Sequence, residues 1–294
     1  MGTILRWLTW IGQGVGIGVA NVIPGVSGGT MALIFGIYER LIALLSDLVR
    51  AGLKLLTFDF KGFWTDVRVL DLPFLFWLAV GVVMAPLLGA AIIPDALETW
   101  PEESRSLFFG LILGTLPIPW LRINHHGAKY VGVMLVAAAI SFLLVGIPPL
   151  DPGDPGMIAV FLAAAIAICA MILPGVSGAF ILLVLGMYAP IFEAIDARDP
   201  MVIGVFVLGA GIGLGSFAVF LKWLLERAHD VTMAALVGLM AGSLRSLWPW
   251  LTEDRSLVLP ESGDPVTWVI LLGLGGLVVS IGMTILEIRR KKDN

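Results

Sequence analysis

Long apolar runs separated by short polar turns cover nearly the whole chain. A helix that crosses a bilayer needs about 20 predominantly apolar residues. Six runs approach this length, and they lie at residues 73–94, 106–121, 130–147, 201–224, 231–248 and 266–287. The pattern predicts an all-α polytopic membrane protein with six membrane-crossing helices.

Two further apolar stretches are each broken by the same short motif. Residues 22–38 read VIPGVSGGTMALIFGIY and residues 172–188 read ILPGVSGAFILLVLGMY, with eight of 17 positions identical. Helices are expected on both sides of each break, over residues 4–23 and 28–48, and over 157–173 and 178–195. Non-helical backbone at membrane depth is tolerated only inside protein or beside a water-filled cavity. We therefore interpret each stretch as a re-entrant helical hairpin rather than as two crossings.

The order of these elements predicts a duplicated unit. Residues 1–150 contain a hairpin, a segment over 49–72 and three spans, whereas residues 151–294 contain a hairpin, three spans and a basic tail. Because each unit crosses the membrane three times, the units have opposite orientations, which defines an inverted-topology repeat. The segment 49–72 alternates basic with bulky apolar residues, and we expect it to lie on the membrane surface.

The basic residues support this threading. It places four of the 18 lysines and arginines on one side of the membrane and the remaining 14 on the other. The four are Arg105, Arg198, Arg245 and Arg255. Because basic residues are enriched on the cytoplasmic side, both termini are predicted to be cytoplasmic. Hairpin 1 then enters from the cytoplasm and hairpin 2 from outside.

Composition narrows the classes of function. The chain is 59% hydrophobic and 14% charged, against about 25% charged residues in soluble domains. Its single cysteine offers no disulfide framework, and its three histidines have no zinc-ligand spacing. The glycine-rich runs follow no predicted strand, so they are not nucleotide-binding loops. We expect no metal, no cofactor and no nucleic acid partner, while assembly into a homo-oligomer stays open.

The hairpin tips carry the candidate chemistry. In each motif a Pro-Gly turn precedes a serine, Ser27 or Ser177, which is expected to be the N-cap of the returning helix. The first amides of a helix lack intrahelical partners, and its positive dipole end favours anions. Gly28, Gly29 and Gly178 leave the backbone open to a ligand. The two tips together predict an anion site near the bilayer midplane.

The predicted site is asymmetric. Asn21 precedes the first tip and Thr30 follows it, where the second tip has Met171 and Phe180. The first tip is therefore expected to be the more polar of the two.

Three charged residues are further candidates. Arg245 lies inside the fifth span, where an arginine is costly and usually functional. It is expected either to bind a phosphate or carboxylate or to extend to the lipid headgroups. Glu39 and Arg40 follow the first tip and are absent from the second. They are candidates for coupling or gating, with an interfacial pair at a helix end as the alternative.

With these residues in view, the sequence resembles the bacterial polyprenyl-phosphate translocases. The resemblance rests on NVIPGVSGGT at residues 21–30, on GIYE at 36–39 and on PGVSG at 174–178, and it extends over nearly the whole chain. It implies a flippase of the bacterial cytoplasmic membrane that returns undecaprenyl phosphate to the cytoplasmic leaflet for envelope synthesis. It also implies a phosphate site lined by Asn21, Ser27, Gly28, Thr30, Ser177 and Gly178, with Glu39 and Arg245 as candidate partners.

The tips also look like those of the undecaprenyl pyrophosphate phosphatases. That family has an arginine in the loop, where this chain has Gly28 and Gly178, and a glutamate pair on the preceding helix, where residues 11–20 contain no acid. Without acid–base carboxylates, we predict a carrier and not an enzyme. A membrane lipid phosphatase and a transporter of a small soluble anion remain the alternatives.

Overall fold

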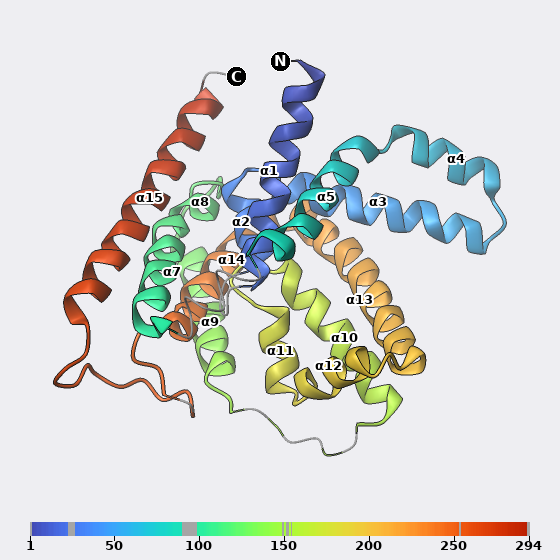
Figure 1. Cartoon of the computed structure of the whole chain (residues 1–294). Helices are drawn as coiled ribbons and strands as arrows, with labels where there is room; N and C mark the ends of the chain where they lie inside the picture. Colours follow the sequence, from blue (N-terminus) through green and yellow to red (C-terminus); the bar gives the residue numbers. More distant parts are fainter. Residues whose placement is uncertain are drawn as a thin grey trace.

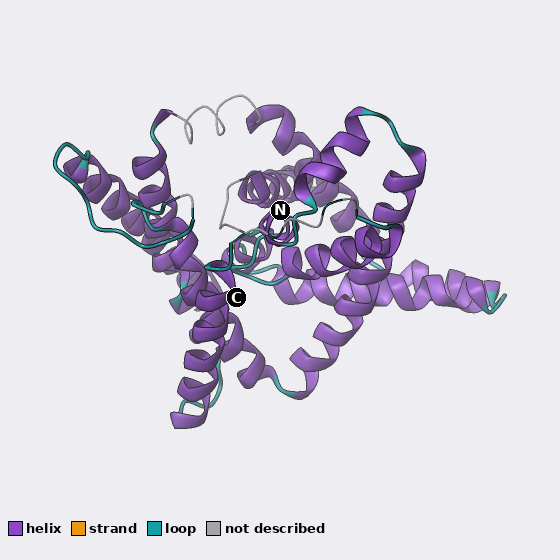
Figure 2. Cartoon of the chain, turned by 90° about the horizontal axis from the view of Figure 1, so that it is seen from below, coloured by secondary structure: helices purple, strands orange, loops and turns teal. Residues whose placement is uncertain are grey.

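The described chain is almost entirely helical. The computed structural model describes residues 2–22, 27–89, 99–148, 150, 153, 155–252 and 254–292. Figures 1 and 2 show helices joined by loops. Within the described residues the extended pairing is a single isolated bridge between Leu251 and Leu257. Pro24, Gly25 and Val26 of the first motif lie outside the described residues. The all-α prediction is confirmed over the part that the structure describes.

The first half supplies the first hairpin and the helices after it. Its helices are α1 (Thr3–Val22), α2 (Gly28–Ile34), α3 (Tyr38–Leu56), α4 (Phe60–Val69), α5 (Leu72–Gly89), α7 (Pro101–Thr115), α8 (Pro117–Trp120) and α9 (Ala128–Val145). The predicted segment 49–72 therefore forms the end of α3 and the amphipathic helix α4.

The second half repeats this order without an equivalent of α4. Its helices are α10 (Met157–Ile172), α11 (Gly178–Val184), α12 (Tyr188–Asp196), α13 (Pro200–Arg227), α14 (His229–Ser243), the 3-10 turn η1 (Leu244–Leu247) and α15 (Val266–Lys292). The six predicted spans thus correspond to α5, α7 with α8, α9, α13, α14 with η1, and α15.

The two hairpins enter from opposite ends of the molecule. Figure 1 shows α1 running inward from the end where both chain ends lie, whereas α10 runs inward from the other end. The end of α9 and the described part of the loop after η1 also lie at that other end (Figure 1). The hairpin tips consequently reach the interior from two sides.

The returning limb of each hairpin is shorter than the sequence analysis predicts. Continuous helices over 28–48 and 178–195 were expected, but α2 ends at Ile34 and α11 at Val184. Gly36 and Gly186 both have φ of 70°, and each amide donates to the carbonyl three residues before it at 3.0 Å. Each glycine thus follows the C-cap residue in a Schellman motif. The prediction was wrong here, although the paired glycines carried the signal.

Helix packing follows the same scheme in both halves. In the first half α1 packs along α5, and in the second α10 packs along α13. The next helices exchange partners between the halves, since α7 packs along α15 and α14 along α9. Gly110 on α7 and Gly238 on α14 occupy matching places at these contacts, because a Cβ on either would overlap a carbonyl of the partner helix. Close backbone approach is typical of helix packing in membranes.

Length and apolarity identify the candidate membrane spans. Among the described residues, α9, α13 and α14 with η1 are long and apolar enough to cross a membrane. Two bent pairs raise the number to as many as five, α4 with α5 at 72° and α11 with α12 at 104°. A bend of this kind is either a broken span or a re-entrant loop. The chain is thus a multi-pass membrane protein.

Candidate functional site

The two hairpin tips meet inside the protein. The Ser27 hydroxyl, at the N-cap of α2, donates a hydrogen bond of 2.8 Å to the carbonyl oxygen of Leu173, just before the second Pro-Gly turn. The hydroxyl oxygen of Ser27 also accepts from the amide of Gly29 at 3.1 Å, which confirms Ser27 as an N-cap. Segments 146 residues apart in the chain are therefore joined at the tips.

A second bond between the tips runs through Thr30. The amide of Gly175 donates to the Thr30 hydroxyl at 3.0 Å, and the Thr30 side chain is fully buried. Gly29 lies so close to the second tip that a Cβ at this position would overlap the carbonyl of Ile172. The first tip therefore fits tightly against the second.

The remaining tip residues brace their own hairpins. The Asn21 side-chain oxygen accepts from the amide of Gly28 at 2.9 Å, which ties the end of α1 to the start of α2. Ser177 caps α11 by accepting from Phe180 at 3.4 Å. Gly178 faces α10, where a Cβ would overlap Met171. The side chains of Asn21, Ser27 and Thr30 are thus all hydrogen-bonded to backbone groups. That they bind a ligand stays a prediction.

Arg245 makes its polar contacts with α9 and with the loop after η1. It sits in η1, and its guanidinium donates at 3.1 Å to the carbonyl of Phe142 near the end of α9 and at 3.1 Å to the carbonyl of Arg255. Its Cζ atom is 4.6 Å from the centre of the Phe142 ring. Arg255 in turn stacks on Phe180 of α11, with its Cζ atom 4.3 Å from the ring centre. Arg245 therefore reaches the second hairpin through Arg255.

Glu39 belongs to a charged network at the end where the chain termini lie. Its carboxylate is 3.6 Å from the guanidinium of Arg122 and 3.7 Å from the ring of His229. Arg122 also donates at 3.1 Å to the carbonyl of Leu33 in α2. Asp230 accepts from the backbone amides that follow Arg122, those of Asn124 at 2.9 Å and His125 at 3.0 Å. The network joins the first hairpin to the start of α14.

Arg40 has different partners from its neighbour Glu39. It forms an ion pair with Asp71, just before α5, and its guanidinium lies 3.9 Å from the centre of the Phe74 ring. Both side chains of the ion pair are partly exposed. This arrangement fits an anchor between α3 and α5.

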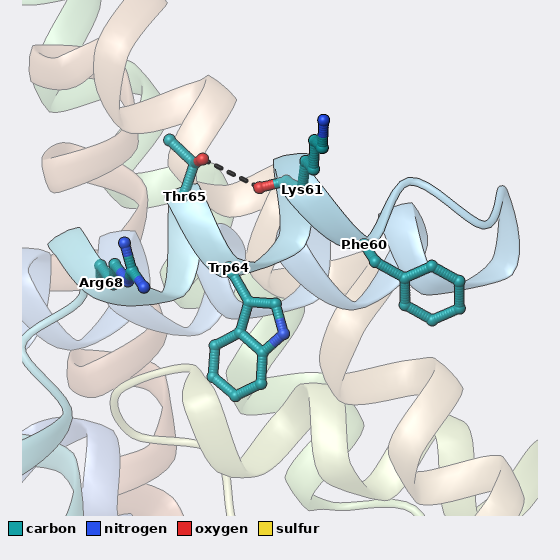
Figure 3. A pocket seen from close by; sticks show the side chains of 5 residues that line it. All are labelled: Phe60, Lys61, Trp64, Thr65 and Arg68. Carbon is teal, nitrogen blue, oxygen red and sulfur yellow. Dashed lines mark hydrogen bonds between the residues drawn. The ribbon is translucent and has the colours of Figure 1, made fainter.

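A pocket of about 620 Å³ lies on α4, away from the tips. It is lined by Phe60, Lys61, Trp64, Thr65 and Arg68. Figure 3 shows the Phe60 and Trp64 rings pointing to one side of the helix and Lys61 to the other. This separation confirms that α4 is amphipathic.

Sequence reasoning missed two residues that the structure brings into these clusters. Asp230 was not singled out, although an acid at the start of an apolar run was a usable signal. Arg255 was treated only as a loop charge. Its position depends on the folded loop after η1, which no local pattern predicts.

Comparison with known proteins agrees with the sequence motifs. Residues 17–263 match the family described as undecaprenyl phosphate translocase-like. A polyprenyl-phosphate transporter of Vibrio cholerae is 38% identical over 267 residues, covering 90% of this chain and 85% of the relative. A polyprenyl-phosphate transporter of Staphylococcus aureus is 28% identical over 268 residues, covering 85% and 88%. No solved structure gives a significant match. The chain belongs to the undecaprenyl phosphate translocase-like family of bacterial membrane transporters.

Proposed function

We propose that this protein carries polyprenyl phosphate, undecaprenyl phosphate in particular, from the outer to the cytoplasmic leaflet of the bacterial cytoplasmic membrane. Membership of the translocase-like family and the two named relatives support the substrate. In this chain the main support is that the tips of the two hairpins are hydrogen-bonded to each other in the protein interior. Paired interrupted helices mark the substrate site in transporters built from inverted repeats.

An inverted-topology repeat of residues 1–150 and 151–294 supplies the frame for transport. The repeated helix packing, the matched glycine caps and the entry of the hairpins from opposite ends (Figure 1) support it. The basic residues of the sequence place the end with both termini in the cytoplasm. In this frame α4 lies on the cytoplasmic membrane surface, with Phe60 and Trp64 toward the lipid.

The tips act as the closed barrier of the pathway. In this conformation the Ser27 hydroxyl is bonded to Leu173, and Thr30 accepts from Gly175. Separation of the tips frees these hydroxyls and the amide of Gly178 for the phosphate. Ser177 and Asn21 hold the two returning helices in place during this change.

Inward transport of a lipid phosphate works against the membrane potential. Moving one negative charge toward an inside-negative face costs about 2.3 kcal/mol per 100 mV. An inward cation or proton offsets this cost. Glu39 is the candidate carrier, because it links the first hairpin to Arg122 and His229 on the cytoplasmic side.

Leaflet-resolved transport in proteoliposomes tests the function. Undecaprenyl phosphate is loaded into the membrane, and a phosphatase added outside hydrolyses only the lipid exposed in the outer leaflet. The wild-type protein is expected to change the accessible fraction much faster than protein-free vesicles. No transport across a range of ion gradients and potentials would contradict the proposed function.

Three variants test the assignment of the tips within the same assay. Ser27→Ala, Ser177→Ala and Arg245→Ala are each expected to slow transport, with folding verified by thermal unfolding in detergent. Wild-type rates in all three variants would contradict the site while leaving the transport function intact.

A further inference from the structure

The loop after η1 is built to hold an arginine in a fixed place. Arg255 has φ of 65°, and its amide donates to the carbonyl of Thr252 at 2.9 Å. The Thr252 hydroxyl accepts from the amide of Ser256 at 2.9 Å, and a bridge between Leu251 and Leu257 closes the turn. A left-handed backbone at a residue that is not glycine is uncommon and often marks a functional position.

Arg255 and Arg245 form a pair of like charges beside the second hairpin. The Arg255 guanidinium donates to the carbonyl of Val145 at 3.3 Å, near the Phe142 carbonyl that Arg245 contacts. Gly146 makes room for them, because a Cβ there would overlap the Arg245 guanidinium. Two elements from different halves of the chain, the end of α9 and the loop after η1, therefore hold the pair together.

No acidic group neutralises this pair among the described residues, which do not include Glu253. The carboxylate of Asp254 is instead occupied by the hydroxyls of Thr252 and Ser256. The guanidinium bonds described above all go to backbone carbonyls. The Nε atom of Arg245 is buried and has no hydrogen-bond partner within the described chain.

Within the described chain this pair of like charges is electrostatically unfavourable. Burial, followed by repulsion from Arg245, lowers the pKa of Arg255 from its usual value. Partly buried charges of one sign raise the free energy of the protein unless an opposite charge is nearby. A phosphate anion meets this need, because guanidinium groups present planar pairs of N–H donors that match its oxygens.

We infer that Arg245 and Arg255 form a binding site for a phosphate monoester, placed between the second hairpin and the surface opposite the chain termini. Phe180 holds Arg255 against α11, so the site adjoins the second tip. The inference rests on the proposed function in one respect, because that function identifies the phosphate as the headgroup of the transported lipid. The site then takes up the lipid headgroup from the outer leaflet before the headgroup reaches the tips.

Binding in detergent tests the site directly. The probes are farnesyl phosphate, which is a short polyprenyl phosphate, its alcohol farnesol, and inorganic phosphate. Arg245→Gln and Arg255→Gln are each expected to weaken binding of farnesyl phosphate by about 10- to 100-fold, the effect of losing a charge-assisted hydrogen bond. Arg255→Lys keeps the charge but loses the paired donors, so an intermediate loss is expected.

Arg198→Gln is the matched control. Arg198 also has positive φ, at 53°, and it lies in the connection before α13, so the substitution removes the same charge elsewhere. Binding within about twofold of wild type is expected for this variant. Equal weakening in Arg198→Gln, or unchanged binding in both Arg245→Gln and Arg255→Gln, would overturn the site.

Chemical modification of the wild-type protein provides a test without variants. Phenylglyoxal reacts with accessible arginines, and mass spectrometry locates the products. Saturating farnesyl phosphate is expected to slow modification of Arg245 and Arg255 but not of Arg198. Unchanged rates at both residues would overturn the site even if the glutamine variants failed to fold.

The same measurements distinguish a lipid headgroup from free phosphate as the ligand. They also test the arginine site separately from the proposed transport function. If inorganic phosphate competes with farnesyl phosphate and binds with equal affinity, the anion site is supported and its ligand is the free ion. Binding that depends on both arginines in a protein that transports no lipid would contradict the proposed function and leave the site standing. If the protein transports lipid but both glutamine variants bind farnesyl phosphate as wild type does, the arginine site is overturned and the proposed function stands.

Discussion

The two hairpins share a motif but lie in different surroundings. Leu33 and Leu183 occupy matching positions, yet Leu33 is 0% exposed and Leu183 is 38% exposed. Tyr38 and Tyr188 differ in the same way, at 1% and 39%. The first hairpin is packed into the main core with α5, α13 and α14, whereas the second packs mainly on α13. Identical residues are therefore structural in one hairpin and peripheral in the other.

The polar contacts follow the same division. Residues of the first tip donate to, or accept from, the backbone of the second, whereas Ser177 caps its own helix and Phe180 faces Arg255. The first hairpin thus supplies the side chains that bond the two tips together. The second lies beside Arg245 and Arg255, where we place an anion site. We propose that the two copies of the motif have different roles.

The largest expected difference between the hairpins comes from the matched leucines. Leu33→Ala is expected to lower the free energy of unfolding by about 3 kcal/mol, because it leaves a cavity in the core. Leu183→Ala removes an exposed side chain and is expected to cost about 0.5 kcal/mol. Denaturant titration in detergent micelles measures both. Equal losses would mean that the two hairpins are packed alike.

The second comparison concerns the residues that follow Gly28 and Gly178, which are Gly29 in the first hairpin and Ala179 in the second. Gly29→Ala is expected to cost about 2 kcal/mol, because the new methyl group must displace the second tip at Ile172. The matching residue Ala179 is exposed, and Ala179→Gly is expected to cost less than about 1 kcal/mol. Thermal unfolding of the two variants provides the test. A neutral Gly29→Ala substitution would contradict the tight fit of the tips.

The smallest expected difference lies between the capping serines. Ser27→Ala removes both a cap and a bond to Leu173, with an expected cost of about 1.5 kcal/mol. Ser177→Ala removes only a long capping bond, and about 0.5 kcal/mol is expected. Unfolding measurements on the single variants decide the order. A larger loss for Ser177→Ala would reverse the roles assigned to the hairpins.

Much of the fold was predictable because apolar length and repeated glycine and proline positions are local signals. The six predicted spans coincide with helices, of which α9, α13 and α14 with η1 are each long and apolar enough to cross a membrane. The helix starts after Ser27 and Ser177 are correct. The break at Gly36 and Gly186 was missed because the apolar pattern continues through it. The sequence also suggested that Asn21 and Thr30 make the first tip more polar. The structure adds that their oxygens accept from backbone amides.

The sequence by itself determined the membrane class and the family, and it predicts a duplication, since each depends on residue types at fixed spacing. Only the tertiary structure decided that the tips bond to each other, that Glu39 joins Arg122 and His229, and that Arg245 lies beside Arg255. These contacts join residues from different halves or distant helices. Their partners are chosen by how the helices pack, and no local pattern in the sequence records that choice.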